Sequence, residues 1–140
     1  MALNLDFAQT FLDYAGVEPH PGVQGRSARA VFAGQPPDDW RRSFYYRYWM
    51  HLAHHHVYAH YGVRTHRHKL IYYYAQALDA AGAVDDPRPP EWELFDLETD
   101  PQELCSVYAD PAYADIVADL KDELHRLQAE CGDEPVEEIG

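Results

Sequence analysis

The sequence predicts an α+β fold: a four-stranded antiparallel sheet packed against one C-terminal amphipathic helix, with two short helices ahead of the sheet. Two observations lead to this class. Four aromatic, β-prone runs occupy the middle of the chain, and a run with an apolar residue at every third or fourth position follows them. A sheet and an amphipathic helix each have an apolar side to bury, so together they form two layers.

Two short helices are expected in the first 34 residues. Asn4 or Asp6 can cap the start of the first helix, and Gly16 can end it. Its apolar face is predicted to consist of Leu5, Ala8, Phe11, Leu12 and Ala15. The second helix has Ser27 as a candidate N-cap and Gly34 as its stop.

The strands and the last helix are predicted from composition and spacing. The strands are expected at 43–49, 60–65, 69–74 and 91–97. The second and third strands are close enough for a hairpin, whereas a long Ala, Gly and Pro loop precedes the fourth. The last helix runs from Pro111 to Cys131 behind Asp110 as N-cap. Its apolar positions are Tyr113, Ile116, Leu120, Leu124, Leu127 and Cys131.

The charge is strongly negative overall but unevenly distributed. Eleven Lys and Arg against 24 Asp and Glu give a net charge of −13, which argues against binding to nucleic acid or an anionic membrane. No acid lies between Arg41 and Gln76, so that segment predicts a locally basic surface suited to a small anion. With neither a membrane-length apolar run nor a secretion signal in the sequence, a cytoplasmic location is the default expectation.

Seven of the nine histidines fall in "HLAHHHVYAHYGVRTHRHKLIYYY", residues 51–74. In an extended segment His54, His56 and His60 project to one face, which leaves a small His-rich metal-binding module as an alternative function. Nothing fixes a fourth ligand, so the favoured interpretation has no metal site: several of these histidines are exposed loop residues, and one or two donate hydrogen bonds to an anion. His51 and His54 are expected in a variable loop, with His66 and His68 flanking a turn.

Three basic side chains are candidates for binding an anion. Arg47, Arg64 and His60 come from neighbouring predicted strands, and converging donors of this kind suit a sulfate, phosphate or carboxylate group. The alternative is that each arginine pairs with an acid elsewhere in the fold. No G-x-S-x-G or glycine-rich phosphate loop occurs, and neither cysteine has a recognisable partner, so the chain alone is predicted to be catalytically inactive.

Six motifs in order resemble the C-terminal portion of type I sulfatases, the formylglycine-dependent members of the alkaline-phosphatase-like superfamily. They are "NLDFAQTFLDYAGV", "GRSARAVFAG", "WRRSFYYRYW", "HHVYAHYGVRTHRHKLIYYY", "WELFDLETDPQEL" and "VYADPAYADIVADLKDELHRLQAE". The resemblance implies that residues 1–38 are the end of a large α/β domain and 39–140 a C-terminal subdomain beside the substrate cleft. It places His55 and His60 near substrate, with Arg47 a weaker candidate and a structural role as the alternative for Arg64.

The departures from the family pattern concern catalysis. The signature C-x-P-x-R or S-x-P-x-R is absent, and so are the aspartates that hold the metal. Calcium and formylglycine are therefore expected only in a catalytic domain missing from this chain, and no cofactor is expected here. The expected partners are a sulfate ester or other small anion and, through the exposed domain interface, a second copy. A structural or oligomerisation module remains a further alternative.

Overall fold

The structure is a computed structural model that describes residues 1–136. Two compact units make up the chain, one from Met1 to Arg42 and one from Ser43 onward. In the described part of the chain, no helix is both long enough and apolar enough to cross a membrane. Each unit is described by itself below.

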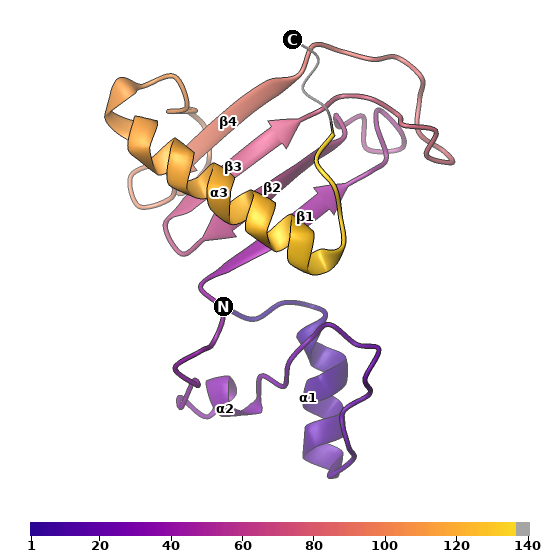
Figure 1. The fold of residues 1–140 in the computed structure, drawn as a ribbon, viewed down its shortest axis with the longest axis vertical. Coiled ribbons are helices and arrows are strands. Elements are labelled where there is room, and N and C mark those ends of the chain that lie inside the picture. The colour runs from indigo at the N-terminus through magenta and orange to yellow at the C-terminus, as the bar shows by residue number, and fades with distance from the viewer. Residues whose placement is uncertain (137–140) are drawn as a thin grey trace. The chain divides into compact units, whose positions relative to one another are not determined.

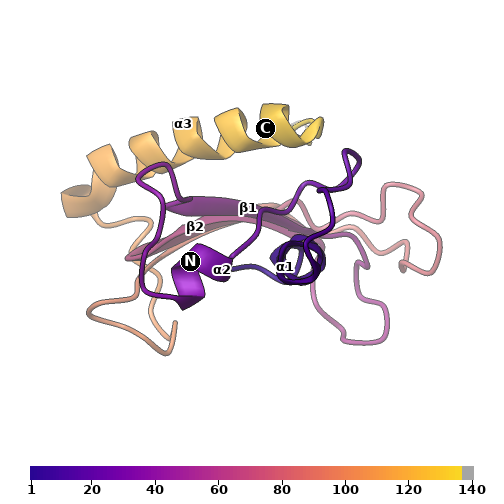
Figure 2. The same ribbon diagram turned by 90° about the horizontal axis from the view of Figure 1, so that it is seen from below.

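The second unit is an antiparallel sheet with a helix on one face. Its strands are β1 (Ser43–Tyr48), β2 (His60–Thr65), β3 (His68–Tyr73) and β4 (Glu91–Asp96), and they lie in the order β1-β2-β3-β4. After the short 3₁₀ turn η1 (Pro111–Tyr113), helix α3 (Ala114–Cys131) crosses the sheet (Figures 1 and 2). The predicted α+β class, the four strands and the hairpin between the second and third strands are confirmed.

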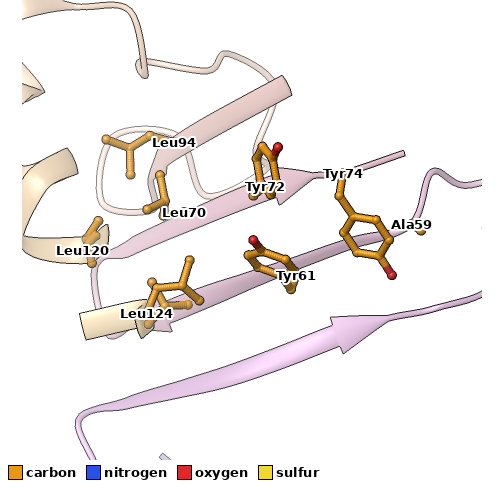
Figure 3. Close-up of a cluster of buried hydrophobic side chains, with 9 residues drawn as sticks. Ala59, Tyr61, Leu70, Tyr72, Tyr74, Leu94, Leu120 and Leu124 are labelled. Atoms are coloured by element: carbon orange, nitrogen blue, oxygen red, sulfur yellow. The ribbon is translucent and has the colours of Figure 1, made fainter. Parts of the chain in front are cut away.

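The core of this unit lies between α3 and the sheet. Leu120 and Leu124 of α3 meet Leu70 and Leu94 of the strands, as Figure 3 shows. The predicted N-cap Asp110 caps η1 rather than α3: its carboxylate accepts a hydrogen bond from the Ala112 amide at 2.9 Å, and α3 itself begins at Ala114. At the other end Gly132 adopts φ 70°, the left-handed conformation that glycine tolerates best.

The first unit contains α1 (Asp6–Ala15) and α2 (Arg29–Phe32). Helix α1 is inverted relative to the usual amphipathic helix, because its buried residues are Asp6, Gln9 and Thr10. The apolar face predicted from the sequence is not buried in this unit, and Phe11 is 70% exposed.

A buried carboxylate organises the first unit. Asp6 accepts hydrogen bonds from the Leu3 amide at 2.8 Å and the Arg26 amide at 3.0 Å, and it forms a two-armed ion pair with Arg41. Burial opposes the charge, but these bonds hold the pKa of Asp6 below its ordinary 3.8. Leu5, not Asn4 or Asp6, is the N-cap of α1, and Ala28, not Ser27, is that of α2. The predicted N-caps of both helices are therefore wrong, whereas Gly16 ends α1 as predicted, with φ 67°.

Candidate functional site

One end of the sheet carries most of the predicted site residues. Strand β1 ends there and β2 begins there, with Tyr48 paired to His60. Strand β3 also ends there and β4 begins there, with Tyr73 paired to Glu91. The loops 49–59 and 74–90 therefore leave the same end of the sheet, as Figure 1 shows. His54, His55 and His56 lie in the first of these loops.

His51 joins the two loops. Its side chain is fully buried, its Nδ1 accepts a hydrogen bond from the Ala59 amide at 3.2 Å, and its Nε2 lies 2.9 Å from the Asp86 carbonyl oxygen. A carbonyl oxygen only accepts, so Nε2 carries the proton and the imidazole is neutral. His51 lies in a loop, as expected, but its buried side chain holds that loop to the next one. The sequence held no sign of this, because Asp86 is 35 positions away.

The loop beyond His51 is tightly turned. The Leu52 amide donates to the Val57 carbonyl at 2.8 Å, and both Leu52 and His56 adopt positive φ, at 50° and 51°. Side-chain-bearing residues rarely take this conformation, which stores strain in the loop. His54 and His55 are exposed with their rings 5.2 Å apart. The turn holds His55 at the surface near the end of the sheet.

His60 lies inside a cage of aromatic rings on the sheet face opposite α3. Its imidazole stacks on Tyr48 at 5.5 Å and lies 5.9 Å from the Tyr46 ring and 5.2 Å from the Tyr73 ring. The hydroxyl oxygens of Tyr46 and Tyr48 are buried without a hydrogen-bond partner in residues 1–136. The sequence analysis did not assign these tyrosines to a site. Their alternation along β1 was the available signal, but it is equally typical of any sheet face.

One backbone contact fixes the tautomer of the neutral His60 ring. Nδ1 lies 2.7 Å from the Tyr58 carbonyl oxygen and is therefore its donor. Burial lowers the pKa of His60 below 6.5. In the neutral ring Nε2 is then a lone-pair acceptor, and no hydrogen bond within the described residues uses it. His60 is suited to receive a hydrogen bond from a ligand.

Arg47 points to the other face of the sheet. It pairs across to Tyr61, donates to the Asp133 carboxylate at 2.6 Å and packs against the Trp49 ring at 3.6 Å. Its side chain is only 7% exposed. Burial opposes its charge, but hydrogen bonds to Asp133 and Tyr74 raise the pKa of Arg47 above its ordinary value. Arg47 thus ties β1 to the residue that follows the end of α3.

Arg64 and Lys69 are paired across β2 and β3 on the same face as His60. The Glu103 carboxylate lies between them: it forms an ion pair with Lys69 and lies 3.9 Å from Arg64. Two adjacent cations repel each other, and this carboxylate offsets that repulsion.

The expected convergence of Arg47, Arg64 and His60 does not form. The expected basic surface is also neutralised, because acids from outside the 41–76 segment pair with five of its cations. These cations are Arg41, Arg47, Arg64, Arg67 and Lys69. The structure agrees instead with the alternative, in which the arginines pair with acids elsewhere in the fold.

The residues of the chain do not fit calcium or formylglycine. The sequence contains neither C-x-P-x-R nor S-x-P-x-R. In the part of the chain that the structure describes, no group of three His, Cys, Asp or Glu side chains is placed to hold a metal ion. The alternative set His54, His56 and His60 is likewise not brought together, and His60 already uses Nδ1 for Tyr58.

Comparison with known proteins identifies relatives along nearly the whole chain. Residues 1–130 match the family model described as "N-sulphoglucosamine sulphohydrolase, C-terminal". An N-acetylglucosamine-6-O-sulfatase of Bacteroides thetaiotaomicron is 36% identical over 140 residues. That alignment covers 99% of this chain but only 23% of the relative. The chain therefore spans about a quarter of the length of this sulfatase.

Solved structures agree with this assignment. BT4656, solved in complex with its substrate D-glucosamine-2-N,6-O-disulfate, superposes with a TM-score of 0.74 at 38% identity, covering 89% of this chain and 23% of that one. A phosphonate monoester hydrolase of Agrobacterium radiobacter shares the fold at a TM-score of 0.64 and 23% identity, over 89% of this chain and 24% of its own. The chain belongs to the family of C-terminal domains of N-sulphoglucosamine sulphohydrolases, and it corresponds to the C-terminal part of a sulfatase.

Proposed function

We propose that this chain supplies one wall of the substrate cleft of a sulfatase that acts on a sulfated glucosamine. The catalytic groups, including formylglycine and calcium, come from an α/β domain that this chain does not contain. Residues 1–38 form the end of that domain, and residues 39–140 form the C-terminal subdomain. The contact boundary between Arg42 and Ser43 supports this division. The named substrates of the two relatives above support the substrate class.

The inverted helix α1 is the observation that carries the proposal. Its polar side, with Asp6 and Gln9, is buried within its own unit, whereas Phe7, Phe11 and Tyr14 are 50%, 70% and 59% exposed. Aromatic rings gathered on one exposed side of a helix are typical of a surface that another layer of protein covers. In a full-length relative, the α/β domain would be the layer that covers this aromatic side of α1.

His55 and His60 are the substrate-facing residues of this proposal. Both lie at the loop end of the sheet, His55 exposed in the tight turn and His60 in the aromatic cage. Arg47 is assigned a structural role because Asp133 and Trp49 occupy its guanidinium. Arg64 is also assigned to the fold, beside Glu103.

A chimera tests the proposal. The C-terminal portion of the N-acetylglucosamine-6-O-sulfatase is replaced by residues 1–140 of this chain, and hydrolysis of 6-O-sulfated N-acetylglucosamine is measured. The N-acetylglucosamine-6-O-sulfatase without its C-terminal portion and the isolated 140-residue chain serve as controls, and both are expected to be inactive. The chimera is expected to recover activity. A folded chimera with intact formylglycine and no activity above the truncated control would refute the proposal.

A further inference from the structure

The aromatic cage around His60 has the chemistry of a site for a neutral donor group. The Tyr58 carbonyl at 2.7 Å requires a proton on Nδ1, so in the neutral ring the lone pair of Nε2 is left for a ligand. The rings of Tyr48 and Tyr73 lie 5.5 and 5.2 Å away and fix the orientation of the imidazole. An acceptor held in this way selects O–H or N–H groups.

A sulfate ester is a poor partner for this nitrogen. At neutral pH its oxygens are acceptors without protons, so they would meet the Nε2 lone pair without forming a hydrogen bond. The arginines that would favour an anion are held elsewhere: Arg47 lies on the opposite face with Asp133, and Arg64 lies near Glu103. Charge and hydrogen-bonding geometry therefore both disfavour sulfate at His60.

Two hydroxyl groups nearby also lack partners. Tyr46 and Tyr48, whose rings contact His60, each have a buried hydroxyl oxygen without a hydrogen bond in residues 1–136. A buried polar group left unpaired costs roughly 1–3 kcal/mol. These hydroxyls are closed to a ligand, so the hydrogen bond that a sugar hydroxyl or N–H group can make here is a donation to Nε2 of His60.

We propose that His60 recognises a hydroxyl or N–H group of the sugar through Nε2, and that this site recognises the carbohydrate rather than its sulfate. The inference rests on the proposed function for its choice of sugar. It assigns to His60 the opposite hydrogen-bonding role from the anion donor expected from the sequence. The sulfate group is then left to the catalytic domain.

The experiment uses the full 140-residue chain with ¹⁵N-labelled histidine. Long-range ¹H–¹⁵N spectra first identify the His60 tautomer, which is expected to carry its proton on Nδ1. N-acetylglucosamine and inorganic sulfate are then titrated separately. The sugar is expected to shift Nε2 of His60, and sulfate is expected to leave it unchanged.

Variants of His60 test whether the hydrogen bond to Nε2, rather than contact with the aromatic rings, contributes to sugar binding. His60→Phe keeps an aromatic ring in the cage but removes the acceptor, and it is expected to weaken sugar binding about fivefold or more, the effect of losing one hydrogen bond. His60→Gln retains an acceptor oxygen and is expected to weaken binding less. His125→Phe, an exposed change on α3, is the matched control and is expected to bind as the unaltered chain does.

Each outcome decides the inference. Sulfate binding that protonates both nitrogens of His60 would overturn it, yet His60 would still contact substrate as the proposed function requires. A His60 signal unmoved by the sugar at saturating concentration would also overturn it, and the chimera would then judge the proposed function independently. A shift by sugar alone, lost in His60→Phe, supports both.

Discussion

The guanidinium of Arg47 donates to the Asp133 carboxylate at 2.6 Å, and so connects the first strand to the residue that follows the end of α3. The Tyr45 hydroxyl donates to the same carboxylate. The Trp49 ring covers the guanidinium at 3.6 Å and keeps it from solvent. This ion pair holds the end of α3 over the sheet. The packing of α3 on the sheet in turn positions the end of the strands from which the loops leave.

Removing one member of that pair should destabilise the second unit. Asp133→Ala leaves the buried charge of Arg47 uncompensated, so we expect the free energy of unfolding to fall by about 3 kcal/mol. Urea unfolding monitored by far-UV circular dichroism provides the measurement. Arg88→Ala, which breaks the exposed pair with Asp86, is the matched control and should cost less than about 1 kcal/mol. Equal losses in the two variants would contradict the role given to Arg47.

The buried imidazole of His51 should hold the two loops in place. His51→Phe preserves a ring beside Tyr58 but leaves the Ala59 amide and the Asp86 carbonyl unpaired. We expect a loss of about 2 kcal/mol or more and faster hydrogen exchange at the Ala59 amide. His54→Phe, at an exposed position in the same loop, should change neither. Unchanged exchange in His51→Phe would show that other contacts hold the loops.

Glycine should relieve backbone strain at His56 but not at His54. His56 has φ 51°, which glycine adopts freely, so His56→Gly should stabilise the chain by roughly 0.5 kcal/mol after the extra entropy of the unfolded state is counted. His54 is not among the residues with positive φ, so His54→Gly should destabilise by about the same amount. The thermal midpoints of the two variants should move in opposite directions, and a shift of the same sign would contradict the loop geometry.

Acid should destabilise the second unit before its carboxylates titrate. The folded-state pKa of His60 lies below 6.5 because the ring is buried, so the unfolded chain binds this proton more readily. The contribution of His60 is present above pH 6.5 and is lost as the pH falls through 6.5 toward the folded value. Asp133, whose pKa lies below 3.8, adds a further loss only at lower pH. Urea unfolding from pH 8 to pH 5 should show a shallower slope in His60→Phe, and the same slope as the unaltered chain in His125→Phe.

The exposed aromatic side of α1 should contribute to assembly rather than to the stability of the isolated chain. Phe11→Ser should change the free energy of unfolding by less than about 0.5 kcal/mol in the 140-residue chain, because the ring is already exposed. In the chimera the same change should lower the thermal midpoint by several degrees, since the ring is buried there. Sedimentation of the isolated chain checks self-association through this surface. Equal effects in both settings would contradict the role of α1 as an interface.

Local patterns predicted most of the second unit. The apolar spacing from Tyr113 to Leu127, with Asp110 ahead of it, is a short-range signal that tertiary structure does not override, and the strand runs are long and rich in aromatic residues. The family resemblance added the connection to a sulfatase, which the comparisons confirm.

The arrangement of the candidate site depended on contacts that spacing cannot supply. Arg47 and His60 lie on opposite faces because Arg47 pairs with Tyr61, and that register is a property of the folded hairpin. His51 is buried because Asp86 comes from a distant loop. The polar side of α1 is buried because Asp6 and Thr10 bond to Arg26, Ala28 and Arg41, which are distant in the sequence.

The central claim is that this chain completes a sulfatase cleft through His60, and the kinetics of the chimera test it most directly. KM and kcat for 6-O-sulfated N-acetylglucosamine are compared in the unaltered chimera, His60→Phe and the surface control His125→Phe. The account predicts that His60→Phe raises KM about fivefold or more, the contribution of one hydrogen bond, while His125→Phe changes nothing. Identical KM and kcat in all three proteins would place His60 outside the cleft and contradict the account.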